Sequence, residues 1–199
     1  TVILARKSRQ EPEQINHYAA AIVISTGMMY LRVMVLILVF NMELFLSIWY
    51  WLLLLAAASA LAATATLWFR NRDTGRTADD IRIDRNPLEF RTALVFTALF
   101  VLLSMITYLV IDRFGTMGLN LLSYLVGIVD IDPFLVSLFA GKFAISMDTM
   151  MAATLQAMVS NNIVKLGYAL FFGGKPTGMH VTLSFLFVIL LNFLFILII

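Results

Sequence analysis

The chain has 199 residues, of which 61% are hydrophobic and only 13% are charged, with a formal net charge of +2. A soluble domain has roughly 25% charged residues, so the composition excludes a water-soluble protein and predicts contact with a lipid bilayer. Most of the basic residues lie between apolar runs and form no basic stripe, which excludes a nucleic-acid partner. The chain has no cysteine and its two histidines are far apart in the sequence, so we expect neither a metal site nor a cofactor.

Six apolar runs are long enough to cross a bilayer, because a helix needs about 20 residues to span roughly 30 Å of hydrocarbon. In chain order they cover residues 18–40, 44–69, 92–111, 115–140, 149–172 and 181–199. Their apolar residues are continuous and do not alternate, which predicts an all-α, polytopic bundle of about six transmembrane helices. The polar run 70–86 divides the chain into a first membrane unit, residues 1–69, and a second unit, residues 87–199.

Lysine and arginine predict the orientation. With the N-terminus inside, the outer loops hold two bases, Arg113 and Lys175, and the inner loops hold ten: Arg6, Lys7, Arg9, Arg70, Arg72, Arg76, Arg82, Arg85, Arg91 and Lys142. The positive-inside rule then predicts a multi-pass protein of the inner (cytoplasmic) membrane with both ends of this chain in the cytoplasm. The opening segment, an apolar fragment running into Arg6, is expected to be the tail of an upstream helix of a longer polypeptide.

Two bases interrupt apolar runs at depth, Arg32 in the first and Lys165 in the fifth. A charge at the centre of a membrane helix costs roughly 2.5–3.5 kcal/mol on insertion scales, so each base calls for a partner or a function. The alternative is that both side chains extend along the helix toward the membrane surface.

A weak internal repeat relates these two bases. Shifting the sequence by 133 positions places Ile22–Asn41 on Leu155–Gly174, and therefore Arg32 on Lys165. It also places Val2–Arg9 on Leu135–Lys142. Because the first and fifth predicted helices both run from inside to outside, the match predicts a parallel repeat, an arrangement common in transporters.

The fourth apolar run contains Asp130 and Asp132, followed by Pro133. Proline cannot donate a backbone hydrogen bond and clashes with the preceding turn, so this run is predicted to be a broken helix. Broken helices occur at membrane depth where they line a cavity, and their open ends can hold ions. The alternative is a short cytoplasmic turn.

The fifth run carries three polar residues near its middle, Ser160, Asn161 and Asn162. Asn161 and Lys165 are four residues apart and therefore share a helix face. A polar face inside the membrane predicts a functional cavity. Hydrogen bonding to a neighbouring helix is the alternative for the asparagines.

Four segments together resemble an uncharacterised bacterial membrane domain that usually follows an MgtC/SapB-type membrane domain in one chain: Asn86-Pro-Leu-Glu-Phe-Arg, Gly127-Ile-Val-Asp-Ile-Asp-Pro, Ser160-Asn-Asn-Ile-Val-Lys and Gly173-Gly174. That family commonly has Gly-Leu-Ala-Asp-Val-Asp-Ala and Asn-Thr-Leu-Val-Lys, so Pro133 and Asn162 are departures from its pattern. The resemblance implies an upstream membrane domain as a partner in the same polypeptide. It implies no settled activity.

These observations lead to the hypothesis of an ion or small-solute transporter, or a channel-like protein. The predicted site residues are Arg32, Asp130, Asp132, Ser160, Asn161, Asn162 and Lys165. The alternative is a membrane regulator or accessory subunit that binds another membrane complex or forms a homo-oligomer. An enzyme is not expected, because the chain has neither a Gly-x-Ser-x-Gly nor a His-Glu-x-x-His motif.

Overall fold

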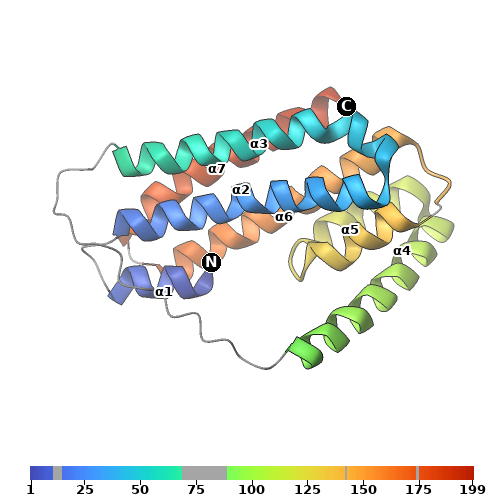
Figure 1. The fold of residues 1–199 in the computed structure, drawn as a ribbon, viewed down its shortest axis with the longest axis horizontal. Helices are drawn as coiled ribbons and strands as arrows, with labels where there is room; N and C mark the ends of the chain where they lie inside the picture. The colour runs from blue at the N-terminus through green and yellow to red at the C-terminus, as the bar shows by residue number, and fades with distance from the viewer. Residues whose placement is uncertain (11–14, 69–88, 142, 174) are drawn as a thin grey trace.

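A computed structural model describes residues 1–10, 15–68, 89–141, 143–173 and 175–199 (Figure 1). In these ranges every regular element is an α-helix, which confirms the predicted all-α class. The helices are α1 (Val2–Gln10), α2 (Ile15–Phe40), α3 (Met42–Trp68), α4 (Glu89–Val126), α5 (Ile131–Ala140), α6 (Met147–Phe172) and α7 (Lys175–Ile198). The predicted polar loop, 70–86, lies outside the described residues.

Four of the described helices are long and apolar enough to cross a membrane. The qualifying segments are Asn16–Phe40, Met42–Trp68, Leu94–Val126 and Val181–Ile198. Helix α6 is as long as α2, at 26 residues, but its polar residues lower its hydropathy. The chain is therefore a multi-pass integral membrane protein, although the predicted count of about six spans is not reproduced.

Helix α6 runs opposite to α2, so the predicted parallel orientation of the repeat is wrong. At one end of the bundle, Asn41 follows α2 and its amide nitrogen lies 3.6 Å from the sulfur of Met150 in the first turn of α6. At the other end, Ala19 near the start of α2 shares a buried cluster with Ala169 near the end of α6. In Figure 1 the two helices run in opposite directions, α2 from left to right and α6 from right to left.

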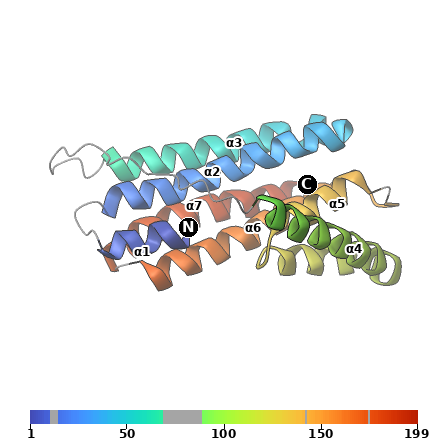
Figure 2. The same ribbon diagram turned by 60° about the horizontal axis from the view of Figure 1, so that its bottom comes forward.

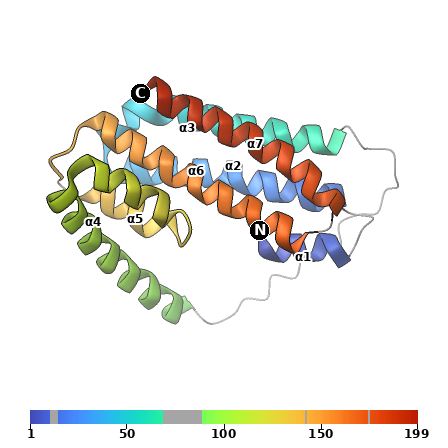
Figure 3. The same cartoon turned by 180° about the vertical axis from the view of Figure 1, so that it is seen from behind.

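The reversal comes from residues 115–140, which were predicted to cross the membrane once. Helix α4 kinks at Gly115, where φ is +59° and ψ is −145°, a conformation that favours glycine. The chain then turns again at residues 127–129 before α5 begins. The part of α4 after Gly115 runs into the bundle and α5 runs back out of it (Figure 3). Helix α6 therefore starts at the end of the bundle where six crossings would have it finish.

The same change moves the carboxyl end of the chain. The rings of Trp51 and Phe195 lie 4.2 Å apart between centroids, which places the end of α7 beside the start of α3. Since α3 starts where α2 ends, α7 finishes at the end of the bundle opposite the start of α2. Six crossings would have placed these two helix ends on one side; the side of the membrane that each chain end faces stays a prediction.

The described helices form the same succession twice, in opposite directions. In each half a helix that runs toward one end of the bundle, α1 or α5, is followed by a hairpin of two long helices (Figure 1). Helices α2 and α6 begin at residues 15 and 147, and α3 and α7 at residues 42 and 175. Each pair keeps nearly the separation of 133 positions seen in the sequence, so the repeat is inverted.

The core lies among α2, α3, α5, α6 and α7. One buried cluster includes Tyr30, Leu52, Phe134 and Met158, and a second, smaller cluster lies toward the end of the bundle where α2 begins. Helix α4 lies apart, beside α5 and α6 (Figure 2). Only 6% of the residues in its most apolar stretch are buried within the chain, which is the exposure expected of a helix surrounded by lipid.

Candidate functional site

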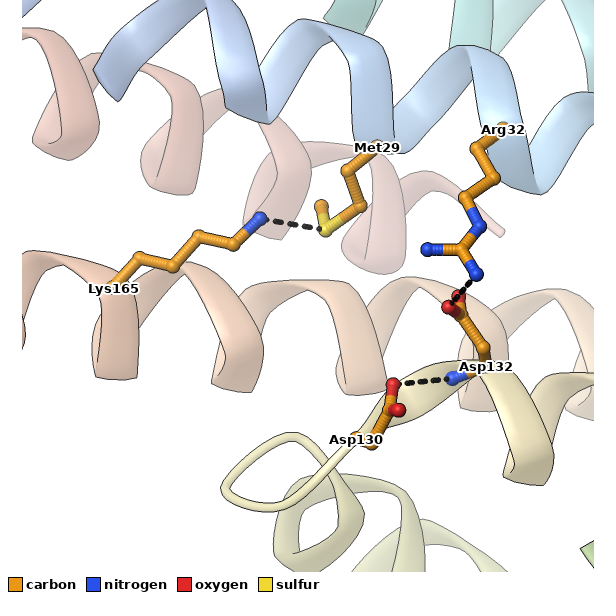
Figure 4. A network of polar contacts seen from close by, with 5 residues as sticks. All are labelled: Met29, Arg32, Asp130, Asp132 and Lys165. Atoms are coloured by element: carbon orange, nitrogen blue, oxygen red, sulfur yellow. Dashed lines mark hydrogen bonds and ion pairs between the residues drawn. The ribbon is translucent and has the colours of Figure 1, made fainter. Parts of the chain in front are cut away.

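The site is built around the interruption between α4 and α5. Asp130 is the N-cap of α5, with extended backbone angles (φ −155°, ψ 123°), and its carboxylate accepts a hydrogen bond of 3.2 Å from the amide of Asp132. Pro133 follows within the first turn, where no intrahelical amide donor is required. The Asp-Ile-Asp-Pro sequence therefore starts a helix, and that start faces the middle of α2 (Figure 4).

Asp132 forms an ion pair with Arg32 of α2, through its Oδ2 and a terminal guanidinium nitrogen (Figure 4). The two side chains differ in exposure: 8% of Asp132 is accessible but 63% of Arg32. Burying a carboxylate without a counter-charge is costly. Arg32 thus compensates a buried acid on the other half of the repeat, and its side chain is committed to that contact.

Lys165 approaches the same place from α6. Its ammonium nitrogen lies 3.3 Å from the sulfur of Met29, a weak acceptor (Figure 4). Among the residues that the structure describes, no carboxylate lies within 4 Å of this nitrogen, although Lys165 is close enough to Asp132 for their charges to interact. Lys165 is therefore the basic group of the site without a direct acidic partner.

A cavity of about 410 Å³ joins these groups. It is lined by Ser25, Met28, Met29, Arg32, Asp130, Ile131, Asp132, Asn161 and Lys165. Five of the seven predicted site residues therefore lie around one cavity, contributed by α2, α6 and the start of α5. The described residues contain no group of three or more His, Cys, Asp or Glu side chains able to hold a metal ion.

Ser160 and Asn161 close the open end of α4. The hydroxyl of Ser160 donates to the carbonyl of Tyr124 over 2.5 Å, and the amide of Asn161 donates to the carbonyl of Gly127 over 3.3 Å. The last carbonyls of a helix lack intrahelical donors, and leaving them unpaired inside a membrane is costly. Ser160, which does not line the cavity, therefore has a structural role, and Asn161 combines that role with a place in the cavity wall.

Gly127 is required at this junction. A Cβ atom there would overlap the Cβ and Oγ of Ser160 and lie 2.8 Å from the backbone nitrogen of Asn161. We expect Gly127→Ala to lower the free energy of unfolding by about 1–3 kcal/mol, the usual cost of overpacking. The measurement is the thermal unfolding midpoint of the purified protein in detergent. Gly167→Ala is the matched control, since a Cβ at Gly167 meets nothing within 4 Å; equal midpoints for the two variants would contradict the close packing.

Asn162 belongs to a different polar cluster. Its amide donates to the hydroxyl of Tyr30 over 2.7 Å, and Asn192 of α7 donates to the same hydroxyl over 3.4 Å. All three side chains are fully buried. Asn162 thus links helices, which was the alternative interpretation of this asparagine. Tyr30 and Asn192 were not predicted, although an asparagine within the apolar run of the last helix was a usable signal.

Residues 1–173, which hold every residue that lines the cavity, match a family described as a domain of unknown function, DUF4010. The chain belongs to the DUF4010 family. An uncharacterised protein of Aquifex aeolicus (strain VF5) is 34% identical to this DUF4010 chain over 113 residues, which is 56% of the chain and 47% of that protein. The chain thus spans about half the length of the curated relative it matches. No solved structure matches it.

Proposed function

We propose that this DUF4010 protein carries an ion or a small polar solute across the membrane, with the cavity between α2, α5 and α6 as its binding site. The observation that carries the proposal is the convergence of Arg32, Asp132 and Lys165 on one cavity at the interruption between α4 and α5. Placing three charges within a membrane bundle is expensive, and such groups commonly mark solute or ion pathways.

The inverted order of the helices supports the same proposal. Many transporters consist of two inverted halves, with the binding site between the halves near the middle of the membrane and formed by interrupted helices. Here Arg32 comes from one half, and Asp132 and Lys165 come from the other. A movement of one half against the other would change the surroundings of the cavity and expose it to one side at a time. We propose transport, and not catalysis, as the outcome.

The proposal is tested by solute entry into proteoliposomes. Light scattering after an osmotic step reports entry of each member of a panel: sodium, potassium and ammonium salts, short organic acids, sugars and amino acids. We expect at least one solute to enter faster than into protein-free vesicles. Asp132→Asn should slow that entry at least tenfold, because it removes the acid that holds Arg32.

The matched control is Asp148→Asn, an exposed aspartate in the first turn of α6 that lies away from the cavity. Its rate should equal that of the wild type. If every solute enters at the protein-free rate, transport is ruled out for the panel. Purification of the chain with a stoichiometric membrane partner would then favour a regulator or accessory subunit.

We further propose the bacterial cytoplasmic membrane as the location and an MgtC/SapB-type membrane domain as the upstream partner in the same polypeptide. Support comes from the resemblance of the segments around Asp130 and Lys165 and from the excess of bases on one side of the apolar runs. A homo-oligomer would cover the exposed apolar face of α4 as lipid does. Crosslinking in native membranes distinguishes a covered face from a lipid-exposed one.

A further inference from the structure

We propose that the occupant of the cavity is a small anion, balanced by the ammonium group of Lys165. This inference rests on the proposed function for its biological role, but anion binding can be measured without transport. Three features carry it: the commitments of the charged groups of the cavity, the capping of α5 by Asp130, and the size and chemistry of the cavity wall.

The charge balance follows from which groups are already committed. Asp132 is paired with Arg32, and Asp130 caps α5 by accepting from the amide of Asp132. Lys165 has a thioether sulfur as its polar contact. Since a charge in a low-dielectric site requires a counter-charge, the group that most needs a partner is a base. An anion supplies that partner without breaking the existing ion pair.

A cation would meet the opposite situation. It would have to draw Asp132 away from Arg32, or Asp130 away from the amino end of α5, to obtain carboxylate ligands. It would also lie between two bases that repel it. The geometry therefore favours an anion over a cation.

The amino end of α5 accounts for the charge of Asp130. Helix α5 runs outward from the middle of the bundle, so its amino end lies at the cavity (Figure 1). The amino end of an α-helix carries the equivalent of roughly half a positive charge, which favours a nearby anion. At α5 that anion is the carboxylate of Asp130, so Lys165 is the base that remains for a bound anion to balance.

The cavity suits a small occupant with an apolar part. Its volume of about 410 Å³ lies within the range of about 300–1,000 Å³ found for ligand pockets. Met28, Met29 and Ile131 supply apolar wall beside the charged groups. A short organic acid places its carboxylate at Lys165 and its carbons on this wall, while an inorganic anion uses the charge alone. The binding test separates these two sources.

The test is the thermal unfolding midpoint of the purified chain in a non-ionic detergent, at constant ionic strength. The anion arm contains sodium chloride, phosphate, acetate and succinate. The cation arm contains the HEPES salts of sodium, potassium and magnesium. A ligand of the folded state raises the midpoint as its concentration exceeds its Kd. We expect at least one anion to raise the midpoint by about 4 °C or more, and no cation to do so.

Two substitutions of the same base keep the result interpretable. Lys165→Met should abolish the anion-dependent rise and Lys165→Arg should retain it, while Lys7→Met, which removes an exposed lysine of α1, should leave it unchanged. A cation-dependent rise, or an anion effect that persists in Lys165→Met, overturns the inference. Anion binding without solute entry would overturn the proposed function alone, and entry of a cation would overturn the anion inference alone.

Discussion

Replacing Arg32 by methionine is expected to destabilise the protein by about 3 kcal/mol, because it leaves the carboxylate of Asp132 buried without its partner. For a chain of this size that corresponds to a fall of roughly 6–12 °C in the unfolding midpoint. Asp132→Leu should cost less, about 1 kcal/mol, since 63% of the Arg32 side chain is accessible and can be solvated when left alone, whereas only 8% of Asp132 is accessible.

The double variant Arg32→Met/Asp132→Leu separates the interaction energy of the ion pair from the effects of the two single substitutions. Replacing a buried ion pair by apolar residues is often neutral or stabilising, so the double variant should recover most of the stability lost in Arg32→Met. Thermal midpoints of the four proteins give the coupling energy. The matched control is the cycle Arg113→Met and Asp112→Leu in α4, where both side chains are exposed and no coupling is expected. Additive effects at Arg32 and Asp132 would show that the contact carries no energy.

The helices were largely predictable from the sequence, because a long continuous apolar run has one stable form in a bilayer. The first predicted run, 18–40, differs from α2 by three residues at its start, and the fifth, 149–172, differs from α6 by two. The number of crossings was not predictable in the same way. Residues 115–140 have the length of a crossing, and only the backbone at Gly115 and the turn after Val126 show that the segment reverses.

The distribution of bases could not reveal this reversal. The segment before α6 and the segment after it each carry one base, Lys142 and Lys175. Reversing α6 exchanges these two and leaves the ratio of ten to two unchanged. The positive-inside rule is therefore satisfied by both arrangements, and it could not distinguish a parallel repeat from an inverted one.

The candidate site was predictable as a set of charges within apolar runs, but its pairings were not. The free-energy cost of a charge at membrane depth identifies Arg32, Asp132 and Lys165 individually as candidate site residues. Which base meets the acid depends on the direction of α6 and on where α5 begins, and both were unknown. Tyr30 was missed because a tyrosine within an apolar run is common, and its importance depends on two asparagines that lie on other helices.

The inverted arrangement makes an all-or-none prediction about sidedness. The chain contains no cysteine, so single cysteines placed at helix ends report on their own positions. Glu43 lies at the start of α3 and Asp148 at the start of α6, which share one end of the bundle. Residue 9, near the end of α1, and residue 175, at the start of α7, lie toward the other end. We expect cysteines at 43 and 148 to label alike, and cysteines at 9 and 175 to label alike and opposite to the first pair.

The measurement is labelling by a membrane-impermeant maleimide in intact cells or sealed vesicles, with labelling after permeabilisation as the control for reactivity. Six full crossings would place residues 9 and 148 on one side and residues 43 and 175 on the other. Each labelled position thus shares its side of the membrane with a different position in the two arrangements, and one labelling experiment distinguishes them. The inverted arrangement also accounts for the observed pairing, because the turn back within residues 115–140 leaves the start of α5 inside the bundle, where Asp132 meets Arg32.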